Sequence, residues 1–231
     1  MKSLRILSGG AAQGLVESLR ASFESATGHR IDGTFGAVGA MRDKLLAGEP
    51  ADLLILTAAL IDGLERDGHV VPGSAKDVGN VETAIAVRRG DAAPAIDNAD
   101  ALRSALLAAD AIHLPDPTQA TAGIHFARVM RDLGIAEQVA DRLRPAPNGA
   151  TAMRALAAST AARPIGCTQV TEILATPGLD LVASLPPGCA LSTTYAAAIT
   201  RRAQAPDAAA RLVAMLTAES GRESRGELGF V

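Results

Sequence analysis

Five turns of this sequence combine glycine with a residue that has a hydroxyl or amide side chain. They comprise residues 8–11, 34–39, 116–123, 148–151 and 166–169. Each one follows a strand-like run or precedes a helix-like run, and the first N–H groups of a helix have partial positive charge and no intrahelical partner. One such turn is typical of a helix cap. Several of them at the ends of strands favour the binding of one anion by uncharged dipoles.

Other chemistries find weaker support in the sequence. Residues 9–14 approach the GxGxxG pattern of dinucleotide binding, but Ala11 replaces the second glycine, although Asp32 follows at a suitable distance. No GxxxxGK[ST], GxSxG or HExxH pattern is present. Cys167 and Cys189 belong to no CxxC or Cys/His cluster, so we expect no metal and no cofactor. The two cysteines are expected to be small buried residues, with a disulfide between them left open.

Composition excludes several classes of partner. Of the 231 residues 48% are hydrophobic, but the most apolar runs, residues 31–40 and 51–60, are too short to span a bilayer. A protein embedded in a membrane is therefore excluded. The net charge of -3 and the absence of tryptophan argue against a nucleic-acid partner. Residues 1–7 contain no signal-peptide core, so the protein is cytoplasmic if Met1 is the native start and periplasmic if a leader was removed.

Strand-like and helix-like patterns alternate along the chain, which predicts an α/β fold with a parallel sheet flanked by helices. In the first part, we expect strands over 4–7, 30–35 and 52–57, and helices over 12–26, 39–47 and 59–67. In the remainder, we expect strands over 81–87, 111–114, 164–168, 179–184 and 191–199, and helices over 98–109, 123–133, 135–143, 151–161 and 206–218. The repeated order suggests two similar lobes.

Residues 36–56 resemble the periplasmic molybdate-binding proteins. The shared pattern is a short turn, an amphipathic helix, and a GxPADL segment that leads into a buried strand, here residues 48–53. Residues 116–123 and 164–166 are similar to the second-lobe turn and a later strand of that family, and the closing segment ends in the pair Gly229-Phe230. The resemblance covers nearly the whole chain.

This resemblance implies a type II periplasmic-binding fold, in which two lobes close on a ligand by hinge motion. Residues 1–79 and 191–231 would form lobe 1, and residues 80–190 would form lobe 2. Each lobe would be a mainly parallel sheet flanked by helices. The resemblance also implies a small anionic ligand and the membrane component of an ABC transporter as partners.

Carried over to this chain, the family's ligand contacts differ at two positions. Ser8 matches the family's first serine, but Val38 stands where a second serine is expected, and Thr168 and Gln169 stand near the family's tyrosine. Tyr195 is a poor substitute by position. Each lost hydroxyl removes about 1.5–3 kcal/mol of charge-assisted hydrogen bonding. The residues expected to line the ligand site are Ser8, Gly9, Gly10, Val38, Gly39, Thr121, Ala122, Thr168 and Gln169.

We therefore expect a solute-binding protein for a small oxyanion or carboxylate, rather than an enzyme. Thr168 and Gln169 would instead suit a larger, planar ligand such as a carboxylate. The alternative is an isomerase that acts on a small polycarboxylate such as aconitate, because aconitate isomerase resembles the same family. That reaction needs a base near an acidic C–H group, and the candidates are Glu172, Asp116 and His125.

Overall fold

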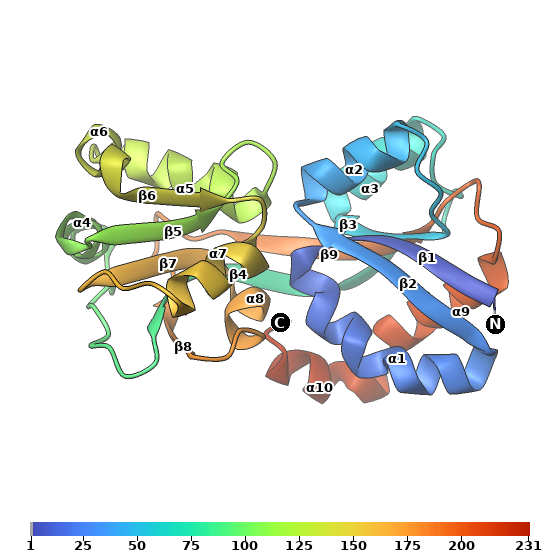
Figure 1. Ribbon diagram of the computed structural model, residues 1–231. Helices are drawn as coiled ribbons and strands as arrows, with labels where there is room; N and C mark the ends of the chain where they lie inside the picture. The colour runs from blue at the N-terminus through green and yellow to red at the C-terminus, as the bar shows by residue number, and fades with distance from the viewer. Residues whose placement is uncertain (1) are drawn as a thin grey trace. The chain divides into compact units, whose positions relative to one another are not determined.

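The computed structural model describes residues 2–231, which form two compact units (Figure 1). Unit 1 runs to Val81 and resumes over Thr193–Val231, and unit 2 comprises Glu82–Ser192. The chain passes between the units in the long strand β4 (Lys76–Arg88) and at the start of β9 (Ser192–Ile199). The α/β fold expected from the sequence is confirmed.

Unit 1 is built on a sheet in the order β2-β1-β3-β9. Strand β1 pairs in parallel with β2 and β3, and β9 returns antiparallel to β3. Figure 1 shows α2 and α3 on one face of this sheet and α1 with α9 on the other. Every residue of β3 is buried, as expected for a central strand covered on both faces. The elements are β1 (Lys2–Gly9), α1 (Gln13–Thr27), β2 (His29–Gly36), α2 (Val38–Leu46), β3 (Leu53–Thr57), α3 (Ala58–Arg66), α9 (Pro206–Leu216) and α10 (Arg222–Glu227).

Unit 2 places three parallel strands in the order β7-β5-β6, and β4 pairs antiparallel with β7 and β8. Two apolar clusters cover the sheet. One includes Leu102, Phe126 and Val139 from α4, α5 and α6, and the other includes Met153 and Ile173 from α7 and α8. The elements are α4 (Ala99–Ala108), β5 (Ala111–Pro115), α5 (Thr121–Asp132), α6 (Ala136–Val139), β6 (Leu143–Ala146), α7 (Gly149–Ala157), β7 (Pro164–Gln169), α8 (Val170–Leu174) and β8 (Leu179–Ser184).

The expected helix over 135–143 is wrong in its second half. Helix α6 ends at Val139, a 3-10 turn follows over Ala140–Arg142, and β6 then begins at Leu143. Strand β6 contains Pro145, which has no N–H to donate and is tolerated because β6 lies at the edge of the sheet. The short helix α8 was also not predicted, because five residues are too few to show a helical period.

Both cysteines of the described chain are free and buried, and they pack in the same apolar cluster. Burial raises the pKa of both thiols. The expectation of small buried residues is confirmed, and the disulfide left open by the sequence is not formed. Among the helices of residues 2–231, none is long and apolar enough to cross a membrane.

Candidate functional site

In unit 1, the turns singled out in the sequence gather at the edge where β1, β2 and β3 end. Because these strands are parallel, their carboxyl ends share one edge, where α/β proteins commonly bind ligands. Ser8 and Gly9 end β1, Gly10 follows them, and Val38 begins α2. A Cβ atom on Gly9 would lie 2.8 Å from Cγ1 of Val38, so β1 and α2 approach each other closely here. Glycine at this position permits that approach.

The hydroxyl of Ser8 already has a hydrogen-bond partner, whereas the first N–H groups of α2 have no capping side chain. Ser8 is fully buried, and its hydroxyl donates to the carbonyl oxygen of Gly9 at 2.9 Å. That hydroxyl must turn away from its own backbone to contact a ligand. Helix α2 has no side-chain cap at its N-terminus, because Ala37 stands at the cap position. The N–H groups of Val38 and Gly39 are therefore not used by a capping side chain, although Val38 itself has no hydroxyl.

Tyr195 belongs to this edge, although its position in the sequence suggested otherwise. Strand β9 pairs antiparallel with β3 and sets Tyr195 opposite Thr57, the last residue of β3. A Cβ atom on Gly9 would lie 3.0 Å from Cε1 of Tyr195, and the tyrosine is buried. Sequence reasoning missed this neighbour because the pairing joins residues far apart in the chain.

In unit 2, three turns gather in the same way at the edge where β5, β6 and β7 end. Thr121 and Ala122 begin α5, Gly149 begins α7, and Thr168 and Gln169 end β7. The side chain of Asn148 caps α7 by accepting from the N–H of Thr151 at 2.9 Å. The structure thus brings together the expected residues of the second half within unit 2, as it does those of the first half within unit 1.

Glu172 lies at the centre of the unit 2 edge. Its carboxylate accepts from Oγ1 of Thr168 at 2.6 Å and from the backbone N–H groups of Ala150 and Gln169. A Cβ atom on Gly149 would lie only 1.8 Å from Oε2 of Glu172 and 2.2 Å from Oγ1 of Thr168, so only glycine fits there. Burial raises the pKa of Glu172, although the three hydrogen bonds oppose that shift.

The other two candidate bases are engaged in local structure. Asp116 accepts from the N–H and hydroxyl of Thr118 and from the N–H of Gln119, and the Thr118 hydroxyl holds the pKa of Asp116 below its usual value. This is a turn that stabilises the loop before α5. Nε2 of His125 lies 2.7 Å from the carbonyl oxygen of Cys189. Neither Asp116 nor His125 is a buried carboxyl group with a raised pKa, as Glu172 is.

Two further buried hydroxyl groups, those of Thr83 and Thr171, lie next to the residues that surround Glu172. Thr83 faces Gln169 across the β4–β7 pair, and Thr171 is the second residue of α8. Neither Oγ1 atom has a hydrogen-bond partner within residues 2–231, although both are buried. A buried hydroxyl without a partner is costly, which makes both atoms candidates for ligand contacts. No pattern in the sequence marks Thr83, because it stands inside a strand rather than in a glycine-containing turn.

Asp52, which stands immediately before β3, has a structural role and lies outside the proposed ligand site. The sequence allows two interpretations of Asp52, as a residue that lines the ligand cleft or as a charge at the beginning of a strand that is either exposed or capping. It is 2% exposed, and its carboxylate accepts from three backbone N–H groups at the opposite end of the unit 1 sheet. Asp52 is therefore neither exposed nor near the turns of the proposed site, and its carboxylate acts as a cap for backbone N–H groups at the start of α9.

Comparison with known proteins identifies relatives along the whole chain. Residues 4–231 match the family model described as bacterial extracellular solute-binding protein. Aconitate isomerase from Pseudomonas sp. is 29% identical over 239 residues, which cover 99% of this chain and 87% of that protein. The resemblance to the molybdate-binding family that the sequence indicated is confirmed.

Solved structures with the same fold include two anion-binding proteins. The periplasmic molybdate-binding protein of Azotobacter vinelandii superposes with a TM-score of 0.81 at 18% identity, and the match covers 99% of this chain and 98% of that one. The sulfate-binding protein SubI of Mycobacterium tuberculosis H37Rv superposes with a TM-score of 0.78 at 16% identity, covering 100% of this chain and 86% of the other. At these identities the likeness concerns the fold.

Proposed function

Because this chain belongs to the bacterial extracellular solute-binding protein family, we propose that it captures a small oxyanion or carboxylate between two hinged units. The observation that carries the proposal is the gathering, within each unit, of glycine-containing turns at the carboxyl ends of parallel strands. In this proposal, the ligand contacts are Ser8, Gly9, Gly10, Val38 and Gly39 of unit 1 and Thr121, Ala122, Thr168 and Gln169 of unit 2. Periplasmic location and an ABC transporter partner are proposed from the family alone.

Within this class we favour a ligand that carries carboxylate groups. Val38 supplies no hydroxyl, and the hydroxyl of Thr168 already donates to Glu172. Both facts reduce the number of donors available to a tetrahedral oxyanion. A buried carboxylate beside the ligand also repels an anion unless one of the two is protonated, and a carboxylate ligand can share a proton with Glu172 near neutral pH. Sulfate has no such proton to share.

The test is titration with a panel of anions. Molybdate, tungstate, sulfate, citrate and trans-aconitate are each added to the protein, and binding is followed by calorimetry and by thermal unfolding. A ligand of the native state at 100 times its Kd raises stability by about 2.7 kcal/mol. We expect this for at least one carboxylate. If none of the anions produces heat or a thermal shift, the proposal fails.

A pair of serine variants adds a site-specific control. Ser8→Ala removes a buried hydroxyl at the proposed site, and we expect it to weaken binding by about 10-fold to 100-fold, as the loss of a charge-assisted hydrogen bond does. Ser25→Ala changes an exposed serine of α1 and should leave the affinity unchanged. Equal affinities of the two variants would remove Ser8 from the site.

A second candidate function is isomerisation of a polycarboxylate, and the environment of Glu172 favours it. A buried carboxylate with a raised pKa suits a general base that must both take and return a proton. In such a step, ionised Glu172 would remove a proton from an sp³ carbon next to the substrate's double bond. The C–H electron pair would form a new C=C bond as the old double bond shifts, and the proton would return at the far carbon.

Turnover separates the two functions. The protein is incubated with trans-aconitate, and the products are separated and quantified. Turnover that is lost in Glu172→Gln while trans-aconitate still binds supports the isomerase. Tight binding of trans-aconitate by the wild-type protein without turnover supports the solute-binding protein.

A further inference from the structure

Unit 1 contains a cavity at the end of its sheet opposite to Ser8 and Gly10. Its volume is about 610 Å³, within the range of about 300–1,000 Å³ that is usual for small-molecule sites. Its walls come from β1, from the loop between α2 and β3, from the turn after α3, and from the segment 200–204 that follows β9. All lining residues belong to unit 1, so the cavity does not depend on the ligand site proposed above.

The walls of this cavity carry an excess of positive charge. Arg5, Arg201 and Arg202 line it together with His69. Within residues 2–231, none of the three guanidinium groups makes an ion pair or a side-chain hydrogen bond, whereas ten other ion pairs are formed. The acidic residue of the lining, Glu49, is already paired with Lys44 at 2.8 Å. Three exposed arginines without an ion pair therefore line one cavity, and the acidic groups next to them are the paired Glu49 and the buried carboxylate of Asp52, which accepts from the N–H of Arg5.

The segment that carries two of these arginines is fixed to the sheet by buried contacts. Oδ1 of Asp52 accepts from the N–H groups of Gln204 at 2.6 Å and Ala205 at 3.1 Å, and its Oδ2 accepts from the N–H of Arg5 at 2.8 Å. The N–H of Arg201 donates to the carbonyl oxygen of His69 at 2.9 Å. Asp52 thus joins the strand of Arg5 to the segment of Arg201 and holds the cavity in place before any ligand enters.

We propose that this cavity is a second anion site, which binds a small ligand with a diphosphate group. A guanidinium group presents paired N–H donors that match the oxygens of phosphate. A diphosphate with about three negative charges balances the three unpaired arginines, whereas a monovalent anion would meet only exposed single charges of small individual effect. Leu46 is half-exposed and lies in the wall, which offers an apolar surface beside the charges.

The first test is titration of the full-length protein with inorganic pyrophosphate and with ADP by calorimetry at low salt. We expect one molar equivalent of pyrophosphate to bind. Arg201→Ala combined with Arg202→Ala should weaken binding at least tenfold, and Arg5→Ala should weaken it as well. Tighter binding of ADP than of pyrophosphate would identify a nucleotide as the source of the diphosphate, and equal binding would identify the diphosphate group alone. Absence of binding to both compounds overturns the proposal.

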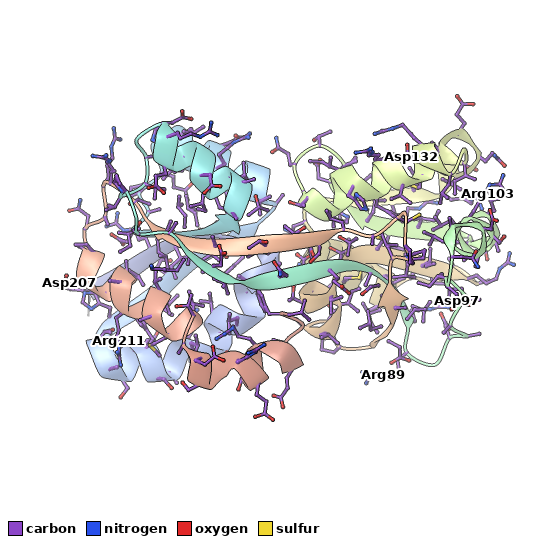
Figure 2. All side chains as sticks on the ribbon, turned by 180° about the vertical axis from the view of Figure 1, so that it is seen from behind. Arg89, Asp97, Arg103, Asp132, Asp207 and Arg211 are labelled. Atoms are coloured by element: carbon purple, nitrogen blue, oxygen red, sulfur yellow. The ribbon has the colours of Figure 1, made fainter. Side chains whose placement is uncertain are left out.

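Two controls separate a built site from a general effect of charge. Arg211, labelled in Figure 2, is an exposed arginine of α9 that is unpaired within residues 2–231 and lies outside the cavity lining. Arg211→Ala should leave the pyrophosphate affinity unchanged, and an equal loss in this variant overturns the proposal. Ser8→Ala should also bind pyrophosphate normally. If Ser8→Ala loses pyrophosphate, the anion occupies the site proposed for the main ligand and the second site is refuted.

Discussion

Substitution of Gly149 by alanine tests the central packing of unit 2. The added methyl group would lie 1.8 Å from Oε2 of Glu172 and 2.2 Å from Oγ1 of Thr168. Ordinary carbon–oxygen contacts are longer than 3 Å, so the methyl group and the Glu172–Thr168 pair cannot keep their positions. The carboxyl group must move by more than an ångström or α7 must shift away from α8.

The expected loss of stability has two sources, overpacking around the new methyl group and disruption of the Glu172–Thr168 hydrogen bond. Overpacking of a well-packed interior costs about 1–3 kcal/mol. Loss of a buried hydrogen bond that leaves a polar group without a partner adds about 1–3 kcal/mol. Replacement of a helical glycine by alanine returns about 0.5–1 kcal/mol. Gly149→Ala should therefore lower the free energy of unfolding by about 1–5 kcal/mol.

Urea unfolding followed by circular dichroism measures this change, with Gly63→Ala as the matched control. Gly63 lies inside α3, and a Cβ atom there would come no closer than 4.0 Å to Nη2 of Arg66. Gly63→Ala should leave stability unchanged or raise it by up to about 1 kcal/mol. The double variant with Glu172→Ala should recover part of the loss, because the clashing carboxyl is gone. The reasoning is refuted if Gly149→Ala is as stable as the wild-type protein.

Three other variants probe buried groups. Because its folded pKa lies above the ordinary 4.5, Glu172 binds its proton more tightly in the native state, and wild-type stability should fall as pH rises from 4.5 through the folded pKa. Thermal melts of Glu172→Gln should lack this fall, which amounts to about 1.4 kcal/mol for each pKa unit. Cys167→Ser should lose stability to urea, whereas reduction of the wild-type protein should change nothing, since both cysteines are free thiols. Asp52→Ala leaves three backbone donors unpaired and should cost about 3 kcal/mol or more in urea unfolding, at about 1–3 kcal/mol for each donor.

Much of the fold could be predicted because local patterns encode it. The alternation of short apolar runs with helical periods gave every strand of unit 1, and β3 is buried throughout as its uninterrupted apolar run predicted. The failures were short elements. Strand β6 and helix α8 have four and five residues, which is less than the length over which a period can be recognised.

The candidate site could be predicted only where it depends on local chemistry. Ser8 and Thr168 stand in turns with glycine or at strand ends, which the sequence displays. Tyr195 joins the unit 1 edge and Thr83 joins the unit 2 edge, each through a strand pairing that spans a long stretch of the chain. Two partners of Glu172, Thr168 and Gln169, stand four and three residues before it, and the N–H of Ala150 alone comes from a more distant part of the chain. No local pattern reports which distant strands pair.

The two units contribute different chemistry to the proposed ligand site. At the unit 1 edge, Ser8 and the first residues of α2 offer uncharged donors only. At the unit 2 edge, Glu172 places a carboxyl group among the donors and takes up the N–H of Ala150 that would otherwise be free for an anion. In the proposed function, an ionised Glu172 would therefore weaken anion binding, and a protonated one would strengthen it.

This asymmetry has a consequence for how one fold can serve two functions. In the proposed binding protein the protonated form of Glu172 would favour the anion, whereas in the proposed isomerase ionised Glu172 would take a proton from the substrate and later return it. Under the two proposals, the same residue would influence affinity in a binding protein and transfer the proton in an isomerase. The step between the two functions depends on whether an acidic C–H group of the ligand comes within hydrogen-bonding reach of Glu172. Ligand chemistry, more than any change of fold, would decide which function a member of this family performs.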